Sequence, residues 1–246
     1  MNTPSPNLTV VVPVHNEADN VVPLIDEIVA ALTGVCDFEI IYVDDGSTDG
    51  TLEKLTQITA AGPRLRVLRH RQCCGQSASI VSGVTAARAG LIATLDGDGQ
   101  NDPADLSVVL AAFQATPEND RVMITGLRAK RRDTWIKRMS SKVANGVRAR
   151  LLGDDTPDTG CGLKIFPRAA FMDLPRFDHM HRFLPALMIR AGGRVISIPV
   201  NHRPRRRGTS KYGTLDRLWV GIFDLIGVMW LQRRARRPNV EEVTPK

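Results

Sequence analysis

The chain has 246 residues and a mass of 27.0 kDa, the size of one domain with at most a modest appendage. It is 43% hydrophobic and 24% charged, which excludes a disordered or collagen-like chain. The formal net charge of +7 is unevenly distributed. Residues 121–153 hold ten basic residues and one acidic residue, and residues 200–237 hold ten and two, so the two segments carry +17 and the remainder −10. Basic charge confined to two segments is a weak indication of nucleic-acid binding.

Reduced thiols are expected, because the four cysteines form no Cys-x-x-Cys pair and lack the spacing of a zinc site. They are Cys36, Cys73, Cys74 and Cys161. The first apolar run, residues 8–14, is short, contains Pro13 and follows no basic region, so no secretory signal is expected. Both observations favour a cytoplasmic protein.

Short β-branched runs alternate with helical patterns, which predicts an α/β fold with a mainly parallel sheet flanked by helices. The predicted strands are Leu8–Val14, Phe38–Val43, Arg64–Leu68, Leu91–Leu95, Arg121–Thr125, Leu163–Phe166 and Arg194–Val200. The predicted helices are Asn20–Leu32 with Gly34 as its cap, a helix capped by Ser47 or Asp49 that ends at Thr59, Gly75–Ala89, a helix with Pro103 in its first turn, Thr134–Leu152 and His181–Ala191.

The last predicted helix, Leu218–Leu231, is apolar or glycine at every position except Asp224. Its length of about 21 Å is less than the roughly 30 Å of a bilayer core, so it is not expected to span a membrane. Large apolar side chains share one face, namely Trp219, Ile222, Phe223, Ile226 and Trp230, and arginines flank both ends. This pattern favours a helix in an anionic membrane interface. Packing on the domain or at a dimer contact stays open, and with it a homo-oligomer.

Three polar clusters follow predicted strands. They are Pro13-Val14-His15-Asn16-Glu17, Asp44-Asp45-Gly46-Ser47-Thr48-Asp49-Gly50 and Asp96-Gly97-Asp98-Gly99-Gln100. Turns and helix caps favour the same residue types, so each cluster alone is weak evidence of a site. Ligands of an open parallel sheet, however, bind at the carboxyl ends of the strands. Three clusters at one edge therefore predict a shared binding site.

Asp96 and Asp98 form the cluster with the clearest chemistry. Two carboxylates separated by one glycine suit a hard divalent cation, Mg²⁺ or Mn²⁺, which can bridge phosphate oxygens. Asp98 is the favoured direct ligand, whereas Asp96 faces a ribose or the water shell of the metal. The cluster is not an EF-hand, because Ser107 stands where the bidentate Glu is needed. No phosphate loop of the Gly-Lys-Ser/Thr kind and no Gly-x-Gly-x-x-Gly after the first strand is present, which disfavours common NTPases and dinucleotide enzymes.

In their order and spacing, the three clusters resemble the family 2 inverting glycosyltransferases of the GT-A (Rossmann-like) fold. Further stretches are similar to one branch, the polyprenyl-phosphate (dolichol-phosphate) mannosyltransferases. They are Gly75-Gln76-Ser77, Asp98–Pro103, Asp158–Lys164, His181–Pro185 and Gly208–Gly213. Cys73-Cys74 departs from this branch, where an Asn is common, and many relatives carry further transmembrane helices. The resemblance covers residues 8–213 and implies a catalytic domain at 1–213 and a membrane-associating helix with a basic tail at 214–246.

The resemblance implies roles for individual residues. Binding of the nucleotide-sugar is implied for Pro13, His15, Glu17, Val43, Asp45, Asp96, Gly97, Asp98, Gln100 and Arg128. Metal binding is implied for Asp96 and Asp98, and a catalytic role for Asp96, Asp98 and Asp158. Capping of the loop before Leu163 stays open as the alternative role of Asp158. Binding of the acceptor phosphate is implied for Arg138, Arg205 and Lys211.

The implied enzyme is a metal-assisted hexosyltransferase of cell-envelope biosynthesis. It moves a sugar, with mannose favoured, from GDP-mannose or a UDP-sugar to a polyprenyl phosphate at the inner face of the cytoplasmic membrane. The acceptor phosphate is already an anion, so the enzyme must mainly position it and neutralise charge. UDP-glucose, UDP-N-acetylglucosamine and a UDP-uronic acid stay open as donors. One alternative is a family 2 transferase that glycosylates a lipid-linked saccharide or glycan with a carboxylate base. Another is a non-enzymatic membrane-recruited scaffold or nucleic-acid-binding protein, although no nucleic-acid-binding motif is evident and nucleic acid is not expected as a partner.

Overall fold

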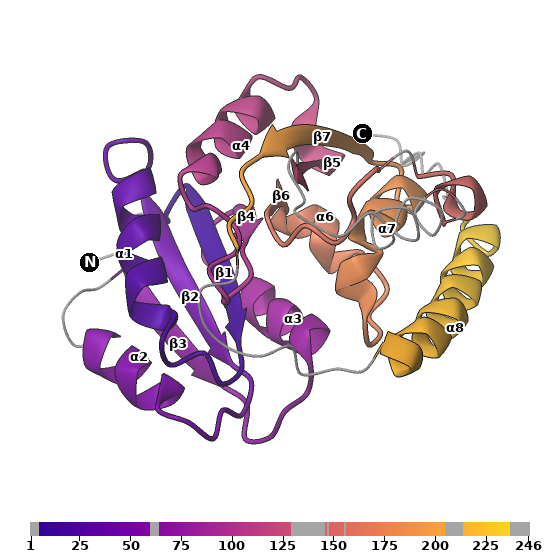
Figure 1. Ribbon diagram of the computed structural model, residues 1–246. Helices are drawn as coiled ribbons and strands as arrows, with labels where there is room; N and C mark the ends of the chain where they lie inside the picture. Colours follow the sequence, from indigo (N-terminus) through magenta and orange to yellow (C-terminus); the bar gives the residue numbers. More distant parts are fainter. Residues whose placement is uncertain are drawn as a thin grey trace, which may run out of the picture.

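The computed structural model describes residues 5–59, 64–128, 146, 148–154, 156–204 and 214–236. Seven strands form one sheet in the order β3-β2-β1-β4-β6-β5-β7 (Figure 1). They are β1 (Leu8–Val14), β2 (Phe38–Asp44), β3 (Leu65–Arg69), β4 (Leu91–Thr94), β5 (Val122–Arg128), β6 (Lys164–Pro167) and β7 (Arg194–Val200). Every predicted strand is present, and the α/β class with a mainly parallel sheet is confirmed.

One strand of the sheet runs against the other six. Strands β1, β2, β3 and β4 pair in parallel, as do β5 and β7. Strand β6 lies antiparallel between β4 and β5, where Lys164 pairs with both Thr94 and Thr125. The start of β6 therefore lies at the same edge of the sheet as the carboxyl ends of its neighbours.

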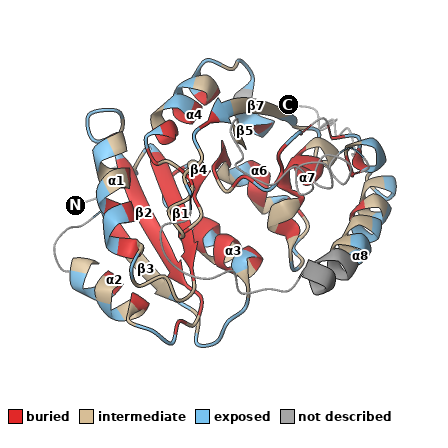
Figure 2. Cartoon of the chain, viewed as in Figure 1, coloured by how far each residue is buried: buried red, intermediate tan, exposed pale blue. Residues whose placement is uncertain are grey.

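Helices cover both faces of the sheet (Figure 1). On one face, α1 (Val21–Leu32), α2 (Thr51–Thr59) and α4 (Asp105–Gln114) share a hydrophobic core with the strands. On the other face, α3 (Gln76–Ala86), α6 (Arg168–Met172) and α7 (Leu184–Arg190) share a second core. Figure 2 shows β1 and β2 buried along their whole length, as expected of strands covered on both faces.

The ends of the helices follow local sequence signals in most places. Gly34, just after α1, has a φ of +80°, the left-handed conformation that makes glycine a common helix terminator. At the start of α2, the backbone N–H of Thr51 donates to Asp49 Oδ1 at 2.9 Å, so Asp49 is one of the two predicted caps. Helix α4 begins at Asp105, two residues after Pro103.

Three helical segments differ from the prediction. The segment expected as the single helix His181–Ala191 is divided into the 3-10 turn η2 (Met180–Arg182) and α7. Helix α6 and the 3-10 turn η1 (Asn119–Arg121) are additional, because five and three residues are too short for a recognisable period. The expected helix Thr134–Leu152 lies largely outside the described residues.

Helix α8 (Thr214–Arg233) contains the predicted Leu218–Leu231 segment and is longer at both ends. It is attached to the domain beside α7. Arg190 Nε donates to the carbonyl of Leu231 at 2.9 Å, and Gln232 Nε2 donates to the carbonyl of Leu152 at 2.7 Å. Asp224, the one acid of the apolar run, lies 3.1 Å from Nδ1 of His179, next to η2.

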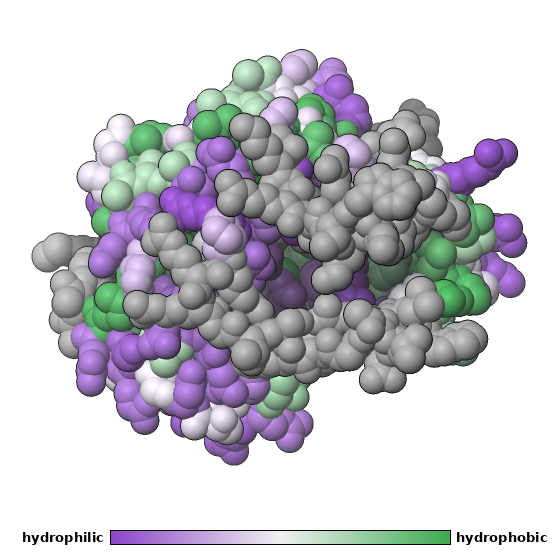
Figure 3. Space-filling view, in the orientation of Figure 1, coloured by the Kyte–Doolittle hydropathy of each residue, from purple (hydrophilic) through white to green (hydrophobic). Residues whose placement is uncertain are grey.

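Large apolar side chains of α8 are exposed to solvent. The exposed fractions are 39% for Ile222, 69% for Phe223, 58% for Ile226 and 58% for Trp230. Figure 3 shows hydrophobic atoms at the right-hand edge of the molecule, where Figure 1 places α8. The side chain of Trp219 lies outside the described part. In the part of the chain that the structure describes, no helix has both the length and the apolar character needed to cross a bilayer. The division of the chain at residues 213 and 214 stays a prediction.

Candidate active site

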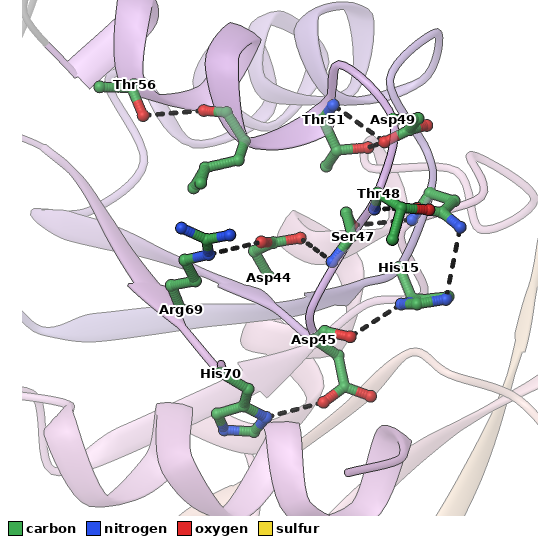
Figure 4. Close-up of polar contacts among 12 residues, drawn as sticks. His15, Asp44, Asp45, Ser47, Thr48, Asp49, Thr51, Thr56, Arg69 and His70 are labelled. Carbon is green, nitrogen blue, oxygen red and sulfur yellow. Dashed lines mark hydrogen bonds and ion pairs between the residues drawn. The ribbon is translucent and has the colours of Figure 1, made fainter. Parts of the chain in front are cut away.

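The loops after β1 and β2 are joined by hydrogen bonds (Figure 4). Nδ1 of His15 lies 2.7 Å from the carbonyl oxygen of Asp45. The backbone N–H of Asn16 donates to Ser47 Oγ at 2.8 Å, and that of Thr48 donates to Asn16 Oδ1 at 2.7 Å. Because β1 and β2 are parallel neighbours, the first two polar clusters lie together at one edge of the sheet, as the sequence predicts.

The carboxylate of Asp45 is fixed by four donors or donor candidates. The backbone N–H groups of Cys74 and Gly75 donate to it at 2.9 and 2.8 Å. His70 Nδ1 lies 2.7 Å away, and the thiol of Cys73 donates at 3.2 Å. Burial by itself raises the pKa of Asp45, but these hydrogen bonds outweigh burial and lower it. Asp45 is therefore a rigidly held carboxylate in its ionised form at neutral pH.

Asp45, His70 and Cys74 also place three potential metal-ligand atoms within 4.8 Å of one another. A set with nitrogen and sulfur suits zinc better than Mg²⁺ or Mn²⁺. Since the oxygens of Asp45 are already taken by hydrogen bonds, this group is read as a structural support of the loop. It is distinct from the predicted metal ligands Asp96 and Asp98.

Two further residues assigned to the nucleotide are held by the fold. Glu17 accepts a hydrogen bond from Asn20 Nδ2 at 2.6 Å, and its backbone N–H donates to Thr51 Oγ1. Val43 is fully buried in the second core. The side chain of Val43 therefore belongs to the interior, so any contact of this residue with a base would have to come from its backbone.

Two glycines allow the chain to pack closely around Asp96. A Cβ at Gly97 would lie 2.4 Å from Val14 Cγ1, and a Cβ at Gly162 would lie 2.3 Å from Asp96 Cγ. Any larger residue at either position would force the end of β4 away from its neighbours. Gln76 Nε2 donates to Asp96 Oδ1 at 2.8 Å, so the first residue of α3 orients the carboxylate.

The electrostatic surroundings of Asp96 are unusual. Burial, followed by the nearby charge of Asp98, raises the pKa of Asp96 to about 6, although Lys164, Gln76 and Arg128 act in the opposite direction. A cation beside Asp96 and Asp98 would relieve the repulsion between the two carboxylates, and their oxygens are the ligands that Mg²⁺ and Mn²⁺ prefer. The residues present therefore fit a hard divalent cation.

The two carboxylates open toward different recesses. Asp96 lines a pocket of about 220 Å³ between the ends of β1 and β4, α3, the loop before β6 and η2. Asp98 lines a smaller recess of about 120 Å³ together with Glu27 and Arg203. Gln100 supports the smaller recess, because its backbone N–H donates to Asp98 Oδ1 and its carbonyl accepts from the backbone N–H of Arg203.

The larger pocket is lined by two side chains, those of Lys164 and His181, for which no role was predicted from the sequence. Lys164 is almost fully buried, and its Nζ donates to the carbonyl of Cys161. Nδ1 of His181 lies 2.7 Å from Ser77 Oγ. Burial, with help from neighbouring cations, lowers the pKa of His181 to about 3, so this imidazole is neutral at physiological pH. In the sequence, both residues belong to stretches that carry the family resemblance, Asp158–Lys164 and His181–Pro185.

Arg128, at the end of β5, forms a two-pronged ion pair with Asp158. Its Nε donates to Oδ2 at 2.6 Å and its Nη2 to Oδ1 at 2.7 Å. The hydrogen bond to Asp158 raises the pKa of Arg128. The structure thus brings together two predicted site residues, and their separate roles toward donor and acceptor stay predictions. Arg138, Arg205 and Lys211, predicted to bind the acceptor phosphate, lie outside the described residues.

A family model described as glycosyl transferase family 2 matches residues 9–174, a range that includes all three clusters, Asp158 and Lys164. The chain belongs to glycosyltransferase family 2. The family expected from the sequence is therefore confirmed.

Two curated relatives of this family 2 glycosyltransferase extend the comparison. The dodecaprenyl-phosphate galacturonate synthase of Rhizobium johnstonii is 35% identical over 237 residues, which cover 94% of this chain and 69% of the relative. The undecaprenyl-phosphate 4-deoxy-4-formamido-L-arabinose transferase of Edwardsiella ictaluri is 30% identical over 225 residues, which cover 89% and 66%. The chain thus spans about two thirds of the length of these relatives.

Solved structures support the GT-A fold of the family 2 domain. Mannosyl-3-phosphoglycerate synthase from Rubrobacter xylanophilus superposes with a TM-score of 0.68 over 98% of this chain and 79% of that chain, at 17% identity. Glucosyl-3-phosphoglycerate synthase from Mycobacterium tuberculosis, in a complex with Mn²⁺, UDP-glucose and glycerol 3-phosphate, superposes with a TM-score of 0.66 over 92% and 80%, at 19% identity. At these identities the likeness concerns the fold alone, and it confirms the predicted fold class.

Proposed function

We propose that this family 2 glycosyltransferase transfers a sugar from a nucleotide-sugar to a polyprenyl phosphate. The similarity to dodecaprenyl-phosphate galacturonate synthase across 94% of the chain is the observation that carries the proposal. Both curated relatives are named for a polyprenyl-phosphate acceptor, whereas their sugars differ. Neither name contains mannose, so we replace GDP-mannose with a UDP-sugar as the first candidate donor.

The geometry of the site suits this reaction. The rigid carboxylate of Asp45 and the joined loops after β1 and β2 offer a fixed surface for the nucleotide. Asp96, oriented by Gln76, borders the pocket in which the sugar would lie. A divalent cation held by Asp96 and Asp98 would supply neutralisation of the leaving diphosphate. Arg128, held by Asp158, places a positive charge at the same edge of the sheet.

The acceptor needs little activation, since a phosphate monoester is an anion at neutral pH. Its oxygen can attack the anomeric carbon directly if it is held in line with the leaving group, and one displacement inverts the configuration. No strong base is therefore required of the chain. A transferase that glycosylates a hydroxyl group would need a carboxylate base instead. Asp158 is a poor candidate for that base, because both its oxygens bind Arg128.

A panel of nucleotide-sugars tests the proposal. The purified chain is mixed in detergent with dodecaprenyl phosphate and with GDP-mannose, UDP-glucose, UDP-N-acetylglucosamine or UDP-galacturonate, and the glycosylated lipid is quantified. One UDP-sugar is expected to give a lipid product. Transfer to a lipid-linked saccharide, with none to the bare lipid phosphate, would reject the acceptor proposed here.

The metal is tested separately. Excess chelator and the substitution Asp98→Asn are each expected to abolish transfer, whereas Asp26→Asn, at an exposed position of α1, should leave it unchanged. Adding back Mg²⁺ or Mn²⁺ should restore the chelated wild type but not Asp98→Asn. Full turnover in chelator would remove the metal from the mechanism.

We also propose that α8 lies in the membrane interface, peripheral to the inner leaflet where the lipid acceptor would be reached. Its four exposed apolar side chains are followed by Arg233, Arg234 and Arg236, which are also exposed. Apolar insertion next to arginines suits an anionic surface. Flotation with anionic liposomes should be lost in Phe223→Glu/Trp230→Glu and kept in the α1 control Val22→Glu. Equal flotation of both variants would contradict this proposal.

A further inference from the structure

Lys164 is a buried lysine at the wall of the larger pocket. The residue is 4% exposed, and its Nζ donates to a backbone carbonyl, that of Cys161. Burial lowers the pKa of Lys164, whereas the nearby charges of Asp96 and Asp158 act in the opposite direction. Burial disfavours the charged form of a lysine, and an additional anion beside the amine favours it. An anionic ligand in this pocket would therefore favour the charged form of Lys164.

The other groups around the 220 Å³ pocket leave positive charge in excess. Arg182 is a second cation in the pocket wall, and His181 is neutral there. Among the described lining residues, Asp96 is the one carboxylate, and the nearby Asp158 is taken by Arg128. The pocket thus offers two cations against one acid, and that acid is assigned to the diphosphate side of the donor.

The size and position of the pocket match the sugar of the donor. Its volume is smaller than the roughly 300–1,000 Å³ of sites for drug-sized ligands, and it suits a single ring. Asp96, at the end of β4, lies on the side of the cation and diphosphate. Lys164, at the start of the reversed strand β6, lines the same pocket and is almost fully buried.

We propose that Lys164, supported by Arg182, recognises a carboxylate on the sugar of the donor, so that the substrate is a nucleotide-linked uronic acid. This inference rests on the proposed function and names its substrate class. A uronic acid is the one donor left open by the sequence that carries an anion on its ring. A sugar carboxylate can form a charge-assisted hydrogen bond with the amine, which a neutral sugar cannot, so the site should discriminate in favour of the acid.

Matched donor pairs test the inference. UDP-galacturonate and UDP-galactose, and likewise UDP-glucuronate and UDP-glucose, differ only in the carboxylate. The wild type should use the acid of one pair with a kcat/KM about 100-fold or more above that of the neutral partner. In Lys164→Met this ratio should collapse toward one, while Lys164→Arg should retain part of it. Arg88→Met, at an exposed position far from the pocket, serves as the control.

Three results would overturn the inference. The first is a wild type that prefers a neutral sugar. The second is that Lys164→Met lowers the affinity for the acidic donor, for the neutral donor and for UDP itself by the same factor. That second outcome would assign Lys164 to the diphosphate. The third result is equal affinity of the wild type for acid and neutral donors in calorimetry. If no donor is transferred to a polyprenyl phosphate, the proposed function fails, and calorimetry with the same donor pairs still decides whether the carboxylate is recognised. Thermal melting checks the fold of each variant.

Discussion

Replacement of Asp96 by Asn should stabilise the metal-free protein while abolishing its activity. The pKa of Asp96 is raised from 3.8 to about 6 in the folded chain, so the folded state holds the proton more tightly than the unfolded state. The free energy of unfolding of the wild type therefore falls as pH rises from about 4 to about 6 and stays lower above that range. A shift of about two pKa units at roughly 1.4 kcal/mol each corresponds to about 3 kcal/mol.

An asparagine keeps the hydrogen bond from Gln76 Nε2 but cannot ionise. Urea unfolding in chelator at several pH values should therefore show Asp96→Asn to be more stable than the wild type by up to about 3 kcal/mol above pH 7, since partial exposure and solvent screening make this an upper limit. Below about pH 4 the difference should vanish. The control Asp26→Asn, at an exposed position, should show no such dependence. A variant that is no more stable at neutral pH, or a difference that does not change with pH, would refute the electrostatic account.

Two further substitutions probe the same edge of the sheet. Gly162→Ala should displace Asp96 and strongly reduce transfer, because the added methyl group would lie 2.3 Å from the Asp96 carboxyl carbon; Gly90→Ala, which meets nothing within 4 Å, is the control, and full activity of Gly162→Ala would contradict the packing. Arg128→Met should lower the free energy of unfolding by about 3–5 kcal/mol in urea titrations, since it removes the guanidinium from the largely buried carboxylate of Asp158. Additional replacement of Asp158 by Leu should recover most of that loss, and no recovery would show that the pair is not the cause.

Much of the framework was predictable because it depends on local patterns. Strands β1 and β2 are continuous apolar runs, which is what burial on both faces requires. The position of the three clusters followed from a general property of parallel sheets, namely that the carboxyl ends of the strands meet at one edge. Asp49 and Gly34 occupy the helix ends that their residue types favour.

The rest of the site depends on contacts between distant parts of the chain. A strand pattern indicates which residues are buried but not the direction of the strand, so the antiparallel pairing of β6, and with it the inward position of Lys164, was not predictable. His181 reaches the site because its imidazole contacts Ser77, 104 residues earlier. It does so from a 3-10 turn that follows His179, whose φ is +62°, and a helical period gives no warning of such a turn.

The reversed direction of β6 has a consequence for protein engineering. The chain leaves the sheet at Arg128 and re-enters it at Lys164, and both positions lie at the edge that carries the candidate site. The two ends of the connection between β5 and β6 are therefore both fixed beside the candidate site. Replacement of this connection would keep both of its attachment points, Arg128 and Lys164, at the edge of the sheet that carries the site. Chimeras cut at these two positions offer a direct route to new acceptor or donor preferences on an unchanged scaffold.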